Sequence, residues 1–138
     1  MAEYLLDTGP LVAALCHQDR WHGWARSALP ELRGSFLTCD AVATDAAHLL
    51  RNSPGGVDGM LAMLATGDLV VEHVVPEELP AIHALLTAYA PRMSLADACL
   101  VRMSELHPSA CVITTDKDFR FYRRNRRQVI PFLAPFGK

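Results

Sequence analysis

The chain has 138 residues, of which 51% are hydrophobic and 20% charged, and this size and composition predict one compact domain spanning residues 1–138. No stretch reaches the roughly 18 uncharged apolar residues of a membrane span, and the Met1-Ala2-Glu3 start lacks the basic segment of a leader, so we expect a cytoplasmic protein without a membrane segment. The four cysteines form no CxxC pair, which favours reduced core thiols over disulfides or a zinc site.

The net charge of −2 is unevenly distributed along the chain. Residues 117–127 contain six bases and one acid, Asp118, so the rest of the chain is acidic. An acidic body with one basic edge suits an anionic partner that reaches the body through bound cations. A solvated arginine-rich turn is the alternative interpretation of the same cluster.

Strand and helix patterns alternate along the chain. Apolar runs predict strands at residues 4–6, 36–38, 69–72, 110–113 and 129–130, of which the second and last are the weaker candidates. Helical periodicity predicts helices at about 9–16, 21–29, 41–51, 57–65, 77–89 and 94–106. This alternation predicts an α/β fold with a central parallel sheet of about four to five strands sandwiched between helices.

Two of these strands end on acids. Asp7 follows the first strand directly, and Asp116 follows the strand at 110–113, with Asp118 two residues further on. Ligands collect at the carboxyl ends of parallel strands, so both acids are candidates for a binding site. Helix capping by Asp7 or Thr8, and by Asp116, is the alternative explanation.

Two further acids occupy helices. Asp97 fits a capping box with Ser94, in a helix whose apolar composition predicts burial. Asp45 has Val42 at i−3 and Leu49 at i+4, a pattern that places its carboxylate in the stripe facing the core, while Asp40 accounts for the helix start. Burying a carboxylate without a partner costs on the order of several kcal/mol, because the charge loses its hydration. We therefore expect a positive group near Asp45.

A divalent cation is the group that best balances these acids, because the sequence offers no matching set of buried bases. Ligands that are all oxygen favour Mg²⁺ or Mn²⁺, which lower the pKa of a bound water and neutralise charge on phosphoryl oxygens. Together with the basic edge, this points to phosphodiester hydrolysis.

Four segments then resemble the PIN-domain ribonucleases, particularly the VapC-like toxins of toxin–antitoxin pairs. They are LLDTGPLVAAL, TDAAHLL, SLADACLV and VITTDKDF, in the family's order along nearly the whole chain. The resemblance implies a PIN-like fold and a Mg²⁺- or Mn²⁺-dependent ribonuclease. Its catalytic acids would be Asp7, Asp45, Asp97 and Asp116, with Thr8, Thr115 and Asp118 beside them. The family pattern has Glu where this chain has Asp45, one methylene shorter.

The resemblance also implies roles for these residues. Asp7, Asp97 and Asp116 would hold the metal, and Asp45 would orient or deprotonate the attacking water. His48, at i+3 from Asp45, either supports that carboxylate through a hydrogen bond or is an ordinary boundary histidine. The predicted contacts to the RNA backbone come from five arginines: Arg120, Arg123, Arg124, Arg126 and Arg127.

Partners follow from the same resemblance. A toxin implies a small antitoxin protein that blocks the site, and we expect a homodimer, although the apolar positions between Leu79 and Tyr89 suit either the core or a dimer face. The rival hypothesis is a PIN-like module that binds RNA or protein with weak or no nuclease activity.

Overall fold

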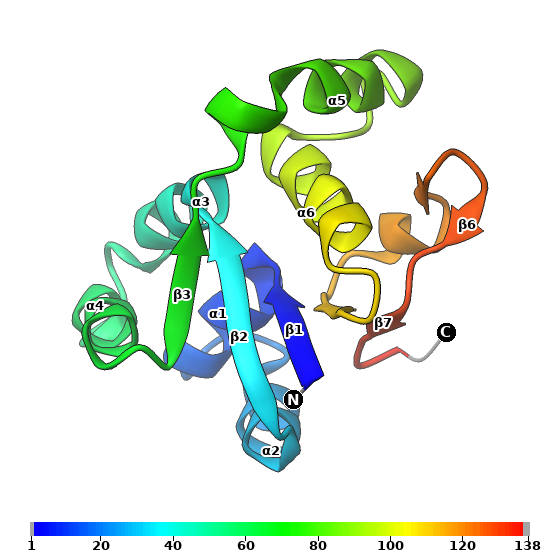
Figure 1. The fold of residues 1–138 in the computed structure, drawn as a ribbon. Helices are drawn as coiled ribbons and strands as arrows, with labels where there is room; N and C mark the ends of the chain where they lie inside the picture. The colour runs from blue at the N-terminus through cyan, green and yellow to red at the C-terminus, as the bar shows by residue number, and fades with distance from the viewer. Residues whose placement is uncertain (1, 137–138) are drawn as a thin grey trace.

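A five-stranded parallel sheet forms the centre of the protein in the computed structural model, which describes residues 2–136 (Figure 1). The strand order is β3-β2-β1-β4-β7, so β1 lies in the middle. The strands are β1 (Ala2–Leu6), β2 (Gly34–Cys39), β3 (Leu69–Glu72), β4 (Cys111–Ile113) and β7 (Phe132–Leu133). The prediction of an α/β fold with a central parallel sheet is confirmed.

In the part of the chain that the structure describes, six α-helices flank the sheet. Figure 1 shows α1, α3 and α4 grouped on one side, and α5 and α6 together on the other. The helices are α1 (Thr8–Leu15), α2 (His22–Ala28), α3 (Asp40–Leu50), α4 (Gly56–Thr66), α5 (Val75–Ala88) and α6 (Leu95–Leu106), and a 3₁₀ turn, η1 (Leu29–Glu31), follows α2. Within the described residues, no helix has the length and apolar content needed to cross a bilayer.

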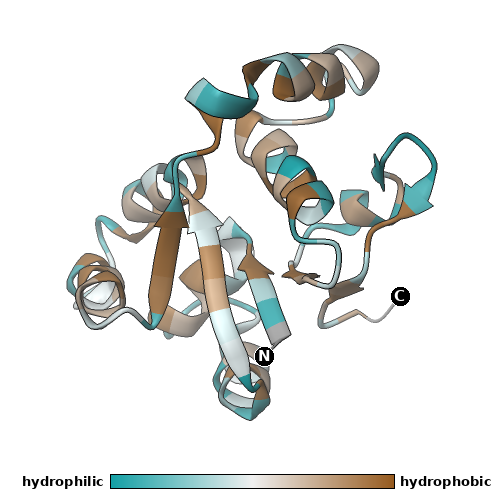
Figure 2. Cartoon of the chain, viewed as in Figure 1, coloured by the Kyte–Doolittle hydropathy of each residue, from teal (hydrophilic) through white to brown (hydrophobic). Residues whose placement is uncertain are grey.

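The last predicted strand differs from the structure. Residues 128–129 form β6 (Gln128–Val129), which pairs antiparallel with β5 (Arg123–Arg124) in a separate hairpin after the 3₁₀ turn η2 (Lys117–Arg120). The fifth strand of the sheet is instead β7, a few residues later. The sequence does not distinguish which of these two short runs joins the central sheet, because each strand has only two paired residues. Figure 2 shows the hairpin as mainly hydrophilic and β3 as hydrophobic.

The middle of the sheet is buried on both faces, as expected for parallel strands between helices. Leu5 and Leu6 of β1 and Val112 and Ile113 of β4 are at most 1% exposed. Because β1 and β4 are neighbours in register, with Leu6 opposite Ile113, their carboxyl ends lie side by side. Asp7 continues this pairing, since its N–H donates a 3.0 Å hydrogen bond to the Ile113 carbonyl.

The four cysteines lie in the core or pack against it. Cys39 and Cys99 are buried, and Cys16 and Cys111 are half-buried.

Candidate active site

Asp7 is a buried carboxylate at the centre of the sheet edge. It is 6% exposed and caps α1 through a 2.8 Å hydrogen bond from the Thr8 N–H to its Oδ1. Its other oxygen, Oδ2, accepts a 2.7 Å hydrogen bond from the hydroxyl of Thr114. Capping therefore uses one side of the carboxylate, and a buried hydroxyl orients the other.

Asp97 is the second buried carboxylate, 8% exposed, at the start of α6. The predicted capping box is confirmed: the Asp97 N–H donates to the Ser94 Oγ at 3.1 Å, and the Ser94 N–H donates to the Asp97 Oδ2 at 3.2 Å. The same Oδ2 accepts a 3.1 Å hydrogen bond from the hydroxyl of Tyr122. A carboxylate can accept about four hydrogen bonds. Among the described residues, none is donated to the Oδ1 of Asp97.

Asp116 lies just after β4 and begins the turn η2. Its Oδ1 accepts a 2.9 Å hydrogen bond from the Asp118 N–H, and its own N–H donates to the Thr114 hydroxyl oxygen at 2.9 Å. Thr114 therefore joins two acids, since its hydroxyl donates to Asp7 and accepts from Asp116. This buried side chain therefore links the segments that follow β1 and β4.

Asp45 differs from the prediction, because it is exposed rather than buried. The buried face of α3 consists of Val42, Ala46 and Leu50, at i, i+4 and i+8, and each is fully buried. Asp45 and Leu49 lie beside that stripe, and Leu49 is 57% exposed. The predicted cap is also wrong: Asp40 makes no capping bond, and its Oδ2 instead lies 2.6 Å from the His73 Nδ1.

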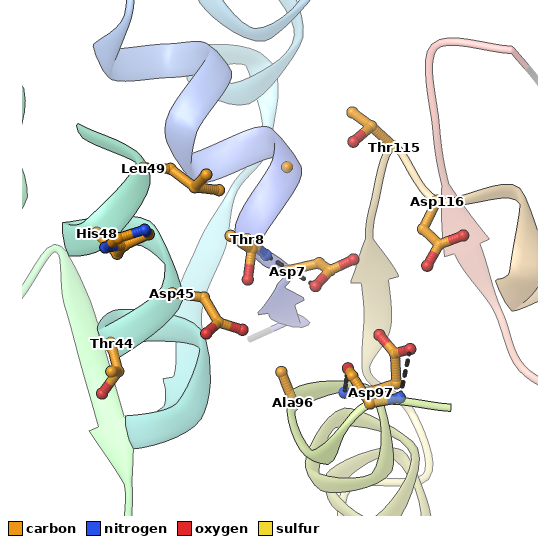
Figure 3. Close-up of a pocket in the computed structure, with 12 residues that line it drawn as sticks. Asp7, Thr8, Thr44, Asp45, His48, Leu49, Ala96, Asp97, Thr115 and Asp116 are labelled. Atoms are coloured by element: carbon orange, nitrogen blue, oxygen red, sulfur yellow. Dashed lines mark hydrogen bonds between the residues drawn. The ribbon is translucent and has the colours of Figure 1, made fainter. Parts of the chain in front are cut away.

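The four predicted acids nevertheless line one cleft of about 830 Å³. Figure 3 shows Asp45 extending from α3 toward the space bordered by Asp7 and Asp97, with Asp116 across the cleft. The acids come from the end of β1, from α3, from the start of α6 and from the segment after β4. Among residues 2–136, the side chains that line the cleft include no Lys or Arg: Asp7, Thr8, Gly9, Thr44, Asp45, His48, Leu49, Ser94, Ala96, Asp97, Thr115 and Asp116.

Burial raises the pKa of the two buried carboxyls, and the neighbouring acids add to the effect. Burial raises the pKa of Asp7 to about 7, against the lowering effect of the Thr114 hydrogen bond, and the charges of Asp97 and Asp116 raise it further. Burial also raises the pKa of Asp97, to which the charge of Asp116 adds. The tyrosine bound to Asp97 responds in the same sense, because burial and the Asp97 charge raise the pKa of Tyr122. A cation in the cleft would relieve this repulsion.

The oxygen donors of the cleft suit a hard divalent ion. Between residues 2 and 136, no three side chains of His, Cys, Asp or Glu are grouped closely enough to hold a metal by themselves. Mg²⁺ is commonly held by one or two carboxylates and completes its shell with water and substrate phosphate. Two buried carboxylates, a third beside them and no competing base fit that mode of binding better than a closed protein cage.

The residues predicted beside the acids occupy varied positions. Thr8 and Thr115 line the cleft, and Thr115 lies so close to Gly9 that a Cβ at Gly9 would overlap its hydroxyl, which explains the glycine. Asp118 lies outside the lining and supports Asp116 through its N–H. His48 lines the cleft, but its ring contacts Arg51, with 3.2 Å between Nε2 and Nη1, rather than Asp45.

The five predicted RNA-binding arginines are not equivalent, and none of them lines the acidic cleft. Arg124 donates from Nη1 to the Ser104 carbonyl at 2.9 Å, at the C-terminal end of α6. Arg123 donates from Nη1 to three carbonyls of residues 120–122. These two guanidinium groups are used within the fold. The exposed ones are Arg120, Arg126 and Arg127.

Sequence reasoning missed Thr114 and Tyr122 as site residues. Both are fully buried, and each hydrogen-bonds an acid at least 25 residues away in the chain. The hydroxyl pair Thr114-Thr115 was visible before Asp116, but only the structure shows that the first hydroxyl reaches Asp7. No local signal connected Tyr122 to Asp97.

Comparisons with known proteins bear on the fold. No protein-family model and no curated protein matches the sequence. Among solved structures, the chain is similar to Mycobacterium tuberculosis VapC20, described as a sarcin-ricin loop cleaving toxin, with a TM-score of 0.74 and 20% identity over 83% of this chain and 91% of that one.

Two further structures are similar at lower identity. A toxin–antitoxin complex from Klebsiella pneumoniae matches with a TM-score of 0.65 and 18% identity, over 84% of this chain and 89% of that one. FitAcB from Neisseria gonorrhoeae matches with a TM-score of 0.55 and 15% identity, over 82% of this chain and 87% of that one. The three structures have the PIN-domain architecture, so the predicted resemblance is confirmed at the level of the fold: this chain has the PIN-domain fold.

Proposed function

We propose that this protein is a Mg²⁺- or Mn²⁺-dependent endoribonuclease that hydrolyses RNA phosphodiester bonds, and that it is the toxin of a toxin–antitoxin pair. The observation that carries the proposal is the convergence of four acids from separate elements on one cleft, where the described part of the chain contributes no Lys or Arg. The fold neighbours support it, since one is described as a toxin that cleaves the sarcin-ricin loop and another as a toxin–antitoxin complex.

Three acids are suited to hold the ion. Asp7 and Asp97 are buried and oriented by hydrogen bonds, and Asp116 is tied to Asp7 through Thr114. When bound, such an ion lowers the pKa of water and offsets charge on phosphoryl oxygens. The hydrogen bonds already present hold the carboxylates in place before the substrate arrives.

Asp45 is suited to a different task. Its carboxylate is exposed, faces the cleft and has no hydrogen bond within the described residues, so it is free to orient a water or accept its proton (Figure 3). A general base acts from within hydrogen-bond reach or through one water. Because the side chain of Asp is one methylene shorter than that of Glu, we propose that the Asp45 carboxylate acts through a bridging water and not by direct contact.

The test is cleavage of RNA with Mg²⁺ or Mn²⁺, with and without EDTA, by the wild type and by Asp7→Asn and Asp97→Asn. We expect metal-dependent cleavage that both substitutions reduce at least a hundredfold, and weaker Mn²⁺ binding by calorimetry in both. Cleavage that persists unchanged in the variants would come from a contaminant and would refute the assignment.

The presence of Asp45 where the family pattern has Glu favours one alternative, a PIN-fold module that binds RNA or protein with weak or no nuclease activity. Binding of RNA without cleavage under every metal tested would support it.

The toxin role has its own test: a small DNA-binding protein encoded beside this chain should form a complex with it and suppress cleavage. A homodimer is part of the proposal and is measurable by light scattering.

A further inference from the structure

Phe121 is a large aromatic residue that the fold leaves exposed. It is 56% exposed, whereas the nearby rings of Phe119 and Tyr122 are fully buried. Its position is nevertheless fixed, because it follows η2 and its N–H donates a 2.8 Å hydrogen bond to the Asp118 carbonyl. Core packing therefore does not explain why this position carries a phenylalanine.

Cations lie over the Phe121 ring and over the ring of Phe136, and one of those over Phe136 is Arg120, the residue before Phe121. The Arg92 Cζ lies 5.2 Å from the Phe121 ring centroid, and the Lys117 Nζ and Arg120 Cζ lie 5.8 and 5.6 Å from that of Phe136. Cation–π contacts of this length are favourable yet leave the outer side of the cation hydrated. We call the group the basic–aromatic ridge: Arg92, Lys117, Arg120, Phe121 and Phe136.

The cations of the ridge are available to an anion. No ion pair between residues 2 and 136 includes Lys117 or Arg120, and Arg92 reaches Asp118 only at 4.0 Å. This contrasts with Arg123 and Arg124, whose guanidinium groups bind backbone carbonyls.

The ridge adjoins the acidic cleft through two segments of the chain. Ser94 lines the cleft two residues after Arg92, and Asp116 lines it immediately before η2. The Asp118 N–H is bonded to the Asp116 carboxylate, and the Asp118 carboxylate faces Arg92. A strand whose scissile phosphate lies at the acids would therefore meet the ridge with its adjoining nucleotides.

From this arrangement we propose that the basic–aromatic ridge binds unpaired nucleotides of the RNA next to the scissile phosphate. Bases without a pairing partner stack on exposed aromatic and guanidinium planes, while neighbouring cations contact the backbone. A duplex keeps its base faces internal and cannot use Phe121 in this way. This inference rests on the proposed function, which supplies the RNA substrate. It adds the residues that select single-stranded segments of that RNA.

Binding is measured in EDTA, so that no cleavage occurs, with a labelled unstructured oligoribonucleotide and a duplex of the same length. We expect Phe121→Leu to weaken single-strand binding about tenfold, from the stacking of one base, and Phe121→Trp to retain it. The matched control is Leu61→Ala on α4, a similarly exposed apolar residue at 52%, which should bind as the wild type does. Duplex binding should be weaker than single-strand binding and insensitive to Phe121.

The cations are tested by the double variant Lys117→Gln and Arg120→Gln. Removing two phosphate contacts should weaken binding and reduce the slope of log affinity against log salt by about 1.4, because each contact on a single strand contributes roughly 0.7. The control is Arg33→Gln, which removes the positive charge of an exposed arginine just after η1. Thermal melting of each variant checks that these exposed substitutions leave the fold intact.

The outcomes separate this inference from the proposed function. Metal-dependent cleavage with unchanged single-strand binding by Phe121→Leu and by the double variant would overturn the ridge and leave the nuclease standing. Weakened binding by the variants with no cleavage under any metal would support the ridge and overturn the nuclease. If the wild type binds no RNA, the ridge proposal fails, and an acidic protein partner becomes the better occupant.

Discussion

The hydroxyl of Tyr122 donates a 3.1 Å hydrogen bond to Oδ2 of Asp97, and both residues are buried. The tyrosine ring is held edge-on against Phe119 and Tyr89, at centroid distances of 5.3 and 5.2 Å, so the hydroxyl has a fixed position. Tyr122 therefore positions a carboxylate that the sequence alone assigned to helix capping and metal binding.

Tyr122→Phe removes only this hydroxyl. A hydrogen bond to a charged group contributes roughly 1.5 to 3 kcal/mol, so we expect about tenfold weaker Mn²⁺ binding and a similar loss of cleavage. Calorimetry and RNA cleavage measure the two effects. Tyr89→Phe is the matched control, because its hydroxyl accepts from the Arg123 N–H and does not touch Asp97. Equal Mn²⁺ affinity in both variants would show that Tyr122 acts only in packing.

Thr114 gives a second test of positioning. Thr114→Val keeps the shape but loses the hydroxyl that joins Asp7 to the Asp116 N–H, so cleavage and Mn²⁺ affinity should fall at least tenfold. Thr114→Ser keeps the hydroxyl and should recover most of both, despite the small cavity it leaves. If Ser and Val behave alike, the effect comes from packing at this buried site and not from the hydrogen bonds.

The raised pKa of Asp7 predicts how stability depends on pH in metal-free protein. Because its folded-state pKa of about 7 lies above the ordinary 3.8, ionisation is costlier in the folded state. The stabilising contribution of the protonated form is present below pH 4 and is lost as pH rises toward 7. Asp7→Asn has no such loss, so the variant should exceed the wild type in stability at pH 8 by roughly 2 to 4 kcal/mol more than at pH 4.

Denaturant unfolding in EDTA at the two pH values measures this difference. Added Mn²⁺ should stabilise the wild type and narrow the gap, since an ion that binds only the folded state shifts the equilibrium. Parallel pH dependence of the two proteins would contradict the burial of an ionisable Asp7.

Substitution of Asp45 should change the rate of RNA cleavage without changing the stability of the fold, because the Asp45 side chain is exposed. Asp45→Asn should lower cleavage about a hundredfold, the usual order for a general base, with an unchanged melting temperature. Asp45→Glu should raise cleavage above the wild type by extending the carboxylate into the cleft. Asp68→Glu, an exposed acid outside the cleft, controls for the added methylene. A slower Asp45→Glu variant would show that the site is fitted to the shorter acid.

Local rules were enough to predict much of this protein. Apolar runs identified β1, β3 and β4, and the capping box at Ser94 and Asp97 was visible in four residues. Asp7 was placed at the end of the first strand because a run of buried residues stops there. These features depend on neighbours in the chain, whose spacing is fixed by the periods of strands and helices.

The tertiary structure decided the features that depend on which surfaces meet. Periodicity predicted that the stripe of α3 containing Asp45 and Leu49 faces the core, but packing selected Val42, Ala46 and Leu50 instead and left Asp45 exposed in the cleft. Packing likewise used Arg123 and Arg124 within the fold and left Arg120 and Lys117 outside. Thr114 reaches Asp7 across 107 positions of sequence. Contacts over such separations depend on the folded arrangement of whole elements, so no local pattern in the chain encodes them.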